Sequence, residues 1–430
     1  MKILPKTLGT RPRLAVEIRW GGVVAARAEA ESDASAGLVA AASRAELGPE
    51  ALEPGLKPGN FRTRAAVIAA VRKTLEAVHE KGMGRQVTLV VPDAVVRVLL
   101  LDFDTLPAKA AEALPVVRFR LKKLLPFDAD DAQVSYQLMA GARAGASPRE
   151  KALVRVVAVA IPRGVLEEYE AVVREAGFEP GAVLSSTLAA LAGLDQAAPI
   201  PALVVNAGPQ SVTTAIVENG VLLLHRSVDM SGNVQVGILA EAAMAQAGVD
   251  EPTQPIALPL VDREASQQEW AMQQPAPQFG RDPYGLGESA ADSAPYANEL
   301  ASVIAAEAEA EARAEKGALS RASTNGAAVA PVYGRGHAPA EEVTQAVSVA
   351  AAYFEDTLQR SPETVLSAGS TGAEALGTML ARAGFGGIGD GGSGAVRVTE
   401  IVGPETLVAQ AASARVPRSW LAGVRGALRS

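Results

Sequence analysis

The sequence predicts an α/β fold made of two related halves, interrupted by a long low-complexity insertion. Apolar strand-like runs alternate with helical patterns along most of the chain, as in α/β proteins. A pattern of strand, polar turn and returning strand occurs twice, beginning near Leu14 and again near Leu203. From Glu251 to about Ala340 the composition shifts to clusters of Gln, Pro, Gly, Ser and Ala, which bury too little apolar surface to fold.

Composition excludes several classes of protein. At 430 residues the chain is long enough for more than one domain, and it has 48% hydrophobic residues, sufficient for a sizeable core. A net charge of -8 argues against a general nucleic-acid binder, and the lack of cysteine excludes disulfides and thiolate metal sites. His79, His225 and His337 are too far apart in sequence for metal-ligand spacing. No apolar run is long enough to span a bilayer and Met1–Lys6 has no signal-like apolar core, so we expect a cytoplasmic protein.

The first half is expected to open on a hairpin over Arg13–Glu29, with Gly21 and Gly22 at its turn. Apolar residues at helical spacing predict a helix over Phe61–Lys81, and a β-rich run predicts a strand over Gln86–Val91. Ala108–Leu125 should be helical in two pieces, because Pro115 interrupts it. A strand over Ala152–Ile161 and a helix over Pro162–Gly177 complete the predicted elements of this half.

The second half repeats the β-turn-β opening and contains the insertion. Strands are expected over Ala202–Val217 and Gly220–Ser227. Within the insertion, which we expect to be mostly disordered, the Ala- and Glu-rich stretch Glu299–Leu319 favours a helix. After it, the chain predicts a helix, a short strand and a second helix, over Ala340–Arg360, Thr364–Leu366 and Gly372–Gly384.

The paired halves resemble the plan of the actin, Hsp70 and sugar-kinase folds, and several motifs resemble those of the PilM family of type IV pilus assembly proteins. The resemblance covers most of the chain outside the insertion, and the order and spacing of the motifs make it specific. The motifs are Arg120–Phe127, Val134–Leu138, Val156–Ile161, Glu175–Pro180, Thr187–Ala190, Val365–Thr371 and Trp420–Arg429. The resemblance implies an actin-like first half over 1–190, with an inserted partner-binding subdomain at about 86–160. It implies a second half over 191–430, which carries the insertion at 251–340.

The resemblance implies ATP with magnesium as the cofactor, but this chain departs from the family in the nucleotide loops. Glu17 stands at the family's Asp position, Arg19 at a Gly position and Val24 at the Lys position. Asn206 replaces an Asp in the second loop, and Leu184-Ser185-Ser186 replaces an acidic stretch. We therefore expect weak nucleotide binding, negligible turnover and no catalytic residue. The expected pocket residues are Glu17, Gly21, Gly22, Asn206, Gly208, Ser211, Ser367, Gly369 and Thr371, with Glu17 the contact for any bound magnesium. Alternatively, Gly21 and Gly22 form only a hairpin turn.

Functionally, the resemblance implies a scaffold that binds the N-terminal cytoplasmic peptide of a PilN-like inner-membrane protein and is peripheral to that membrane through it. The tyrosine-bearing strand Val134–Leu138 offers a sheet edge for an extended peptide, with Tyr136, Lys122 and Lys123 as candidate contacts. The alternatives are an ATP-binding phosphotransferase or ATPase of the same superfold and a GspL-like type II secretion component. The basic run from Arg118 to Lys123 is either a solvated helix side or a face for a partner or membrane. Near the C-terminus, Arg415, Arg418, Arg425 and Arg429 are expected in a solvated tail, with contact to anionic lipid as the alternative.

Overall fold

The computed structural model describes residues 12–29, 38–139, 153–194, 201–230, 340–385, 396–404 and 416–429. All of them belong to one of the two units into which the chain divides, Met1–Gln246 with Gly334–Ser430. The expected insertion at 251–340, with its Ala/Glu helix, lies outside the described residues except for Ala340, where a helix begins.

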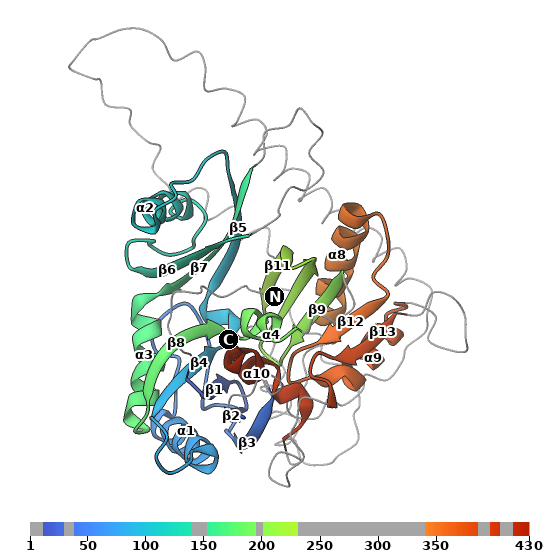
Figure 1. Ribbon diagram of the computed structural model, residues 1–430. Helices are drawn as coiled ribbons and strands as arrows, with labels where there is room; N and C mark the ends of the chain where they lie inside the picture. The colour runs from blue at the N-terminus through green and yellow to red at the C-terminus, as the bar shows by residue number, and fades with distance from the viewer. Residues whose placement is uncertain are drawn as a thin grey trace, which may run out of the picture. The chain divides into compact units, whose positions relative to one another are not determined.

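The first of two large sheets has five strands in the order β3-β2-β1-β4-β8 (Figure 1). Strands β1, β2 and β3 form an antiparallel meander, whereas β4 is parallel to β1 and β8 is parallel to β4. The predicted hairpin is confirmed, and Gly21 takes a φ of +78° at its turn. The strands are β1 (Leu14–Arg19), β2 (Gly22–Ala28), β3 (Val39–Glu46), β4 (Gln86–Val91) and β8 (Glu179–Ser185).

Two strands of this sheet have weak sequence signals. Strand β3 is rich in alanine, which is depleted in strands, and β8 begins Glu-Pro-Gly. The register between β4 and β8 shifts just after Pro180, so an irregularity accommodates the residues that follow it. Helices α1 (Arg64–Val78) and α3 (Arg163–Glu175) cover one face of the sheet over a core that includes Tyr169 and Phe178.

The second large sheet has the order β11-β10-β9-β12-β13, with the same pattern of a meander followed by two parallel strands. The two-halves architecture is therefore confirmed by topology. Helices α8 and α9 pack on this sheet (Figure 1). The elements are β9 (Ala202–Ala207), β10 (Ser211–Glu218), β11 (Val221–Asp229), α8 (Ala340–Leu358), β12 (Thr364–Ser367), α9 (Gly372–Arg382) and β13 (Arg397–Glu400).

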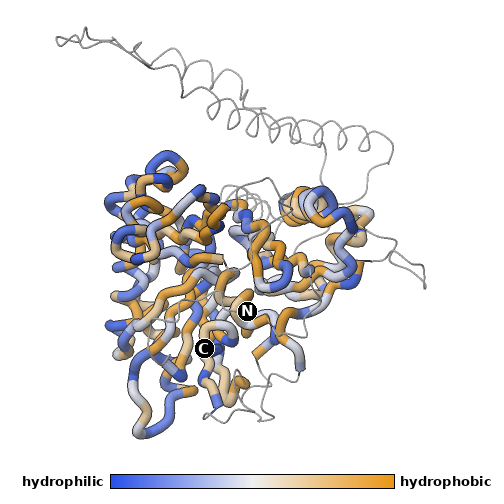
Figure 2. The backbone as a smooth tube through the Cα atoms, turned by 45° about the horizontal axis from the view of Figure 1, so that its top comes forward, coloured by the Kyte–Doolittle hydropathy of each residue, from blue (hydrophilic) through white to orange (hydrophobic). Residues whose placement is uncertain are grey.

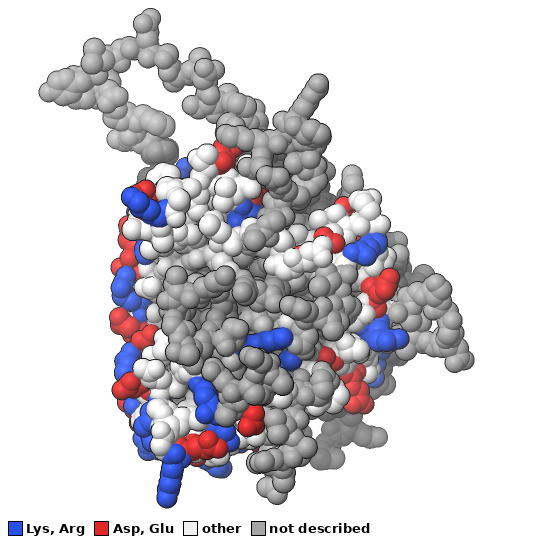
Figure 3. All heavy atoms as spheres, viewed as in Figure 1, with Lys and Arg blue, Asp and Glu red and all other residues white. Residues whose placement is uncertain are grey.

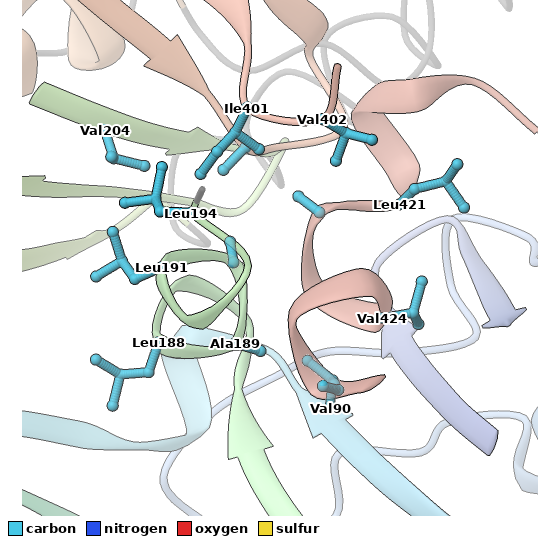
Figure 4. Close-up of a cluster of buried hydrophobic side chains, with 14 of the residues drawn as sticks. Val90, Leu188, Ala189, Leu191, Leu194, Val204, Ile401, Val402, Leu421 and Val424 are labelled. Atoms are coloured by element: carbon cyan, nitrogen blue, oxygen red, sulfur yellow. The ribbon is translucent and has the colours of Figure 1, made fainter. Parts of the chain in front are cut away.

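Helices α4 (Ser186–Ala192) and α10 (Ala422–Leu428) lie side by side, in a core shared by side chains of both sheets (Figure 4). Their close approach requires Gly426, because a Cβ there would lie 1.6 Å from the carbonyl oxygen of Ala189. The expected solvated C-terminal tail is wrong for α10, which is buried along its length. Arg425 is itself buried and donates a hydrogen bond of 2.9 Å to the carbonyl of Gly193.

A smaller three-stranded sheet, with the order β5-β7-β6, comes from the middle of the first half. Helix α2 covers one face of it over a small core, whereas Val98 and Val159 pack into the cores of the large sheets. We call α2 and these three strands the small subdomain. Its elements are β5 (Arg97–Phe103), α2 (Ala110–Leu121), β6 (Ala132–Leu138) and β7 (Val154–Pro162), preceded by the short 3-10 helix η1 (Asp93–Val95).

Helix α2 is one element, so the predicted break at Pro115 is wrong. Pro115 is exposed, and it removes only the hydrogen bond to the carbonyl of Ala111, which is also on the exposed side. Buried Val117 and Leu121 hold the remainder of the helix on the small sheet. Figure 2 shows apolar and hydrophilic segments alternating along the described backbone, with hydrophilic ones at many outer bends.

Candidate functional site

The ends of the strands gather polar side chains between the two large sheets. On β1 the side chains of Leu14, Val16 and Ile18 enter the core beneath α1 and α3, so those of Ala15 and Glu17 face the other way. On β9 the same alternation directs Val204 into the core shared with α10, and Asn206 onto that face. Because β4 and β8 are parallel to β1, Asp93 and Ser186, which follow those strands, meet Glu17 at one edge of the sheet.

A hydrogen-bond network joins these residues across the two halves. Ser186 Oγ donates to Glu17 Oε1 at 2.7 Å, and Thr187 donates to Asp93 through both its backbone N–H and its hydroxyl. The amide of Asn206 donates to Asp93 Oδ2, Ser186 Oγ and Thr187 Oγ1 at 3.0 to 3.1 Å. Both carboxylates are almost fully buried, at 1% and 4% exposed, so each depends on these donors.

Glu17 also has a cation of its own half as a partner. The guanidinium of Arg19 forms an ion pair with Glu17 Oε2, and the Arg19 side chain is only 10% exposed. The ring of Trp420 lies 5.1 Å from this guanidinium, while Arg44 stacks 3.8 Å from the same ring. Gly22 makes room for the indole, because a Cβ there would lie 3.0 Å from the Trp420 ring and 2.7 Å from the carbonyl of Ala45.

The turn between β9 and β10 forms the opposite wall of a pocket with about 490 Å³ of space, including its open mouth. Gly208, Pro209, Gln210 and Ser211 line this wall. The N–H of Gly208 already donates to the carbonyl of Ser211 at 3.0 Å, and Pro209 has no N–H. The turn therefore offers fewer free backbone donors than a phosphate-binding loop usually does.

The loop after β12 contacts the backbone at the end of β9. A Cβ on Gly369 would lie 2.1 Å from the carbonyl oxygen of Ala207, so only glycine permits this approach. Thr371 donates to the same carbonyl through its hydroxyl at 2.9 Å, and Ser367 is buried within β12. The side chain that this loop contributes to the pocket is Ser370.

The structure therefore brings Glu17, Asn206, Gly208 and Ser211 together around the pocket. Gly21 lies at the hairpin turn and Gly22 under Trp420, whereas Gly369 and Thr371 contact Ala207 and Ser367 is buried in β12, and none of these five residues lines the pocket. Sequence reasoning missed Asp93, Arg19 as a partner of Glu17, and Thr187. An acidic residue just beyond the proline that ends the buried strand β4 is the signal that could have revealed Asp93. The full lining is Glu17, Arg19, Trp20, Pro54, Pro92, Asp93, Ala94, Ser186, Asn206, Gly208, Pro209, Gln210, Ser211 and Ser370.

His225 on β11 lies near the same junction, where β11 contacts both η1 and β5. Its Nε2 is buried and makes no hydrogen bond to any described residue. Burial lowers the pKa of His225, while the negative charge of Asp93 acts in the opposite direction. A neutral imidazole is therefore favoured at this junction.

The candidate partner residues lie on the small subdomain. Strand β6 has β7 on one side and no described strand on the other, so it is an edge strand. Tyr136 is half-buried against the core beneath α2. Lys122 donates to Asp130 at 2.6 Å, and that contact raises its pKa, whereas Lys123 is exposed and makes no ion pair with a described residue.

The described part of the chain holds no group of three or more His, Cys, Asp or Glu side chains arranged to bind a metal ion. None of its helices combines the length and apolar character needed to cross a bilayer.

Comparisons with known proteins found similarity at the level of structure. Neither the protein-family models nor the curated proteins include a match to this chain. A solved PilM-PilN type IV pilus biogenesis complex is 14% identical, with a TM-score of 0.56 over 97% of this chain and 98% of that chain. The cytoplasmic domain of EpsL, an inner-membrane component of the type II secretion system of Vibrio cholerae, is 13% identical, with a TM-score of 0.32 over 58% of this chain and 85% of that chain. The ethanolamine utilization protein EutJ from Carboxydothermus hydrogenoformans is 11% identical, with a TM-score of 0.39 over 100% of this chain and 92% of that chain.

The first of these structures shares the architecture of this chain across nearly its whole length. The fold is actin-like, as predicted, and resembles that of PilM. The other two TM-scores are too low to add to this conclusion.

Proposed function

We propose that this protein is a PilM-like scaffold of type IV pilus assembly, which binds an extended N-terminal peptide of a PilN-like inner-membrane protein. The observation that carries the proposal is the fold-level likeness to the PilM-PilN complex over 97% of the chain. In this role the protein is cytoplasmic and peripheral to the inner membrane through its partner. The proposed first half spans 1–190, with the partner-binding subdomain at about 86–160, and the second half spans 191–430.

The hydrogen-bonding pattern of β6 supports peptide binding at its free edge. The N–H of Met139, just after β6, donates to the carbonyl of Arg155. This bond identifies which residues of β6 direct their backbone N–H and C=O groups toward β7 and which direct them away. Since the register with β7 is regular, Val134, Tyr136 and Leu138 direct their N–H and C=O groups away from β7. An added peptide strand would pair with these groups, and exposed side chains of β6 would contact alternate residues of the peptide.

The chemistry of the pocket between the two large sheets supports a role that does not depend on ATP hydrolysis. A magnesium-bound triphosphate needs carboxylate or water ligands for the metal and free donors for the phosphates. Here Glu17 is paired with Arg19 and Ser186, Asp93 accepts from Thr187 and Asn206, and Pro209 lacks a donor. These residues do not fit that ligand, so we assign no catalytic step to the cleft.

The direct test is a fluorescence-anisotropy titration of the purified protein with the N-terminal cytoplasmic peptide of the membrane-anchored protein encoded beside it. We expect saturable binding that Leu138→Pro weakens at least tenfold, because proline removes a donor from the free edge and leaves the β7 pairing intact. The matched control, Leu138→Ala, removes the exposed side chain but keeps the N–H, and should bind nearly as well as wild type. Saturable binding equal in all three proteins would place the peptide elsewhere, and no binding by the folded protein would refute the scaffold.

The alternative function, an ATPase or phosphotransferase of the same superfold, is tested by calorimetry with magnesium and ATP and by a phosphate-release assay. We expect weak or undetectable binding and no turnover. Arg19→Gly restores a small residue beside Glu17, and it should strengthen binding relative to wild type. Steady turnover by the wild type that Glu17→Ala abolishes would establish the enzyme instead.

A further inference from the structure

The outer face of α2 combines exposed apolar side chains with cations that make no ion pair with a described residue. Of the side chains on this helix and the turn that follows it, Phe119 is 70% exposed, Leu124 45% and Val116 38%. Single exposed apolar residues are common, but three within nine positions, on the helix that covers the small sheet, form a local cluster.

Basic side chains border these apolar groups. At helical spacing, Val116, Phe119 and Arg120 share one side of the helix, because residues three and four apart face the same way, and Lys123 lies in the turn that follows. Lys109 pairs with Glu112 and Lys122 with Asp130, whereas Arg120 and Lys123 make no ion pair with a described residue. Figure 3 shows charged side chains beside uncharged surface where α2 lies in Figure 1.

The composition of this face contrasts with the whole chain. The chain has a net charge of -8, so an anionic surface repels the molecule in general. Arg118, Arg120, Lys122 and Lys123 make α2 and the turn after it a basic segment, with Glu112 the acidic residue among positions 110–125. Asp128, Asp130 and Asp131 follow this segment, Lys122 pairs with Asp130, and Arg118 donates to the carbonyls of Ala129 and Ala132. Arg120 and Lys123 are therefore the cations of the segment that remain to attract an anionic surface.

The size of the apolar cluster indicates whether α2 contacts another protein or a lipid bilayer. A stable protein–protein interface buries about 800 Å² on each partner with 20–30 residues, and three apolar side chains fall well short of that. An interfacial helix needs only a few apolar groups that enter the boundary between headgroups and acyl chains, flanked by Lys and Arg. Phe119, which is 70% exposed beside Arg120 near the end of α2 and close to Lys123 in the turn that follows, meets this requirement.

We propose that α2 is a lipid-contacting helix, which inserts Phe119, Val116 and Leu124 into the surface of an anionic bilayer while Arg120 and Lys123 bind lipid phosphates. Each cation near an anionic bilayer contributes about a fivefold increase in partitioning, and the inserted ring contributes about tenfold. The contact is weak by itself and gains strength when a membrane-anchored partner is bound, since the second attachment becomes intramolecular. The proposal rests on the α2 surface and is independent of peptide binding at β6.

Co-sedimentation of the full chain with vesicles tests this inference. One set of vesicles contains equal parts of phosphatidylglycerol and phosphatidylcholine, and the other contains phosphatidylcholine alone. We expect binding to the anionic set that declines with added salt, and little binding to the zwitterionic set. Phe119→Gln should lower partitioning about tenfold, and Lys123→Ala about fivefold.

The matched control is Leu153→Gln, because Leu153 is 47% exposed in the same subdomain but lies outside α2. It should leave vesicle binding unchanged, and circular dichroism should show that all variants are folded. Peptide titration of the same variants separates the two proposals, since Phe119→Gln should leave peptide affinity at the wild-type value. No binding to anionic vesicles at low salt, or equal binding by wild type and Phe119→Gln, would overturn the lipid assignment. Loss of self-association or of peptide binding in Phe119→Gln, with vesicle binding unchanged, would assign the face to a protein instead.

Discussion

The turn after β1 and the turn after β9 occupy equivalent places in the two halves but have different chemistry. In the first half, Arg19 ends β1 just before the turn and lies on the same face as Glu17, and the indole of Trp420 from the C-terminal segment lies 5.1 Å from its guanidinium. In the second half, the turn carries Gly208 and Pro209. The residue of β9 that corresponds to Glu17 of β1 is the neutral Asn206. The same backbone plan therefore supplies a buried ion pair on one side and a neutral donor on the other.

This difference explains how the two halves are joined. The amide of Asn206 reaches three groups of the first half, namely Asp93 and the hydroxyls of Ser186 and Thr187 at the start of α4. An aspartate at this position would lie against Asp93 and repel it. With asparagine at position 206, the two halves are joined by a direct hydrogen bond to Asp93. With aspartate there, the two carboxylates would need a cation between them.

The largest expected effect of a single change is in the first half. Glu17→Ala leaves the Arg19 guanidinium buried without its carboxylate, and should lower the free energy of unfolding by about 3–5 kcal/mol. Urea denaturation measures this loss. Glu53→Ala is the control, because its pair with Arg62 is exposed and should be worth less than about 1 kcal/mol. Equal losses in the two variants would mean that the Glu17 pair is not isolated from solvent.

The next effect lies in the second half, where packing rather than charge is decisive. Gly369→Ala should cost about 3 kcal/mol, because its Cβ would overlap the backbone of Ala207 and force the loop away from β9. Thermal unfolding of Gly208→Ala provides the comparison within the same half. A Cβ there would lie 3.6 Å from Ser370 Oγ, so the change should cost much less. If Gly369→Ala left the free energy of unfolding unchanged, the loop after β12 would have to move freely.

A smaller effect is expected at the contact between the halves. Asn206→Ala removes the donor to Asp93, Ser186 and Thr187, and should cost about 1–2 kcal/mol. A double-mutant cycle with Ser186→Ala, followed by chemical denaturation, should give a coupling energy above about 0.5 kcal/mol. Purely additive losses would mean that the two side chains act separately.

The smallest effect concerns pH. Because burial lowers the pKa of His225, the unfolded chain binds a proton at this residue more readily than the folded protein. Stability contributed by the neutral imidazole is present above the ordinary value of 6.5, and it is lost as the pH falls through 6.5 toward the lower folded value. Unfolding midpoints measured across this window should fall more steeply for wild type than for His225→Gln. Parallel profiles would show that His225 does not contribute.

The sequence by itself determined the α/β alternation, the repeated β-turn-β opening and most of the secondary structure. These features depend on local patterns, since period-two and helical spacings of Val, Leu and Ala define strand and helix faces wherever they occur. Glycine at Gly21 and the proline that ends β4 are equally local signals. Strand β8 could not be predicted in this way, because its Pro180 and Gly181 are tolerated only through the irregular pairing with β4.

The tertiary structure alone decided what the cleft contains. Glu17, Asp93, Ser186 and Asn206 come from four separate segments, and only the parallel arrangement of β1, β4 and β8 opposite β9 brings their side chains together. The sequence identified Glu17 as the expected metal contact, but it could not show that Arg19 would pair with it under Trp420. The two residues are two apart on β1 and so share a face, but the burial of Arg19 beside Trp420 depends on the C-terminal segment returning to the first sheet, which no local pattern encodes.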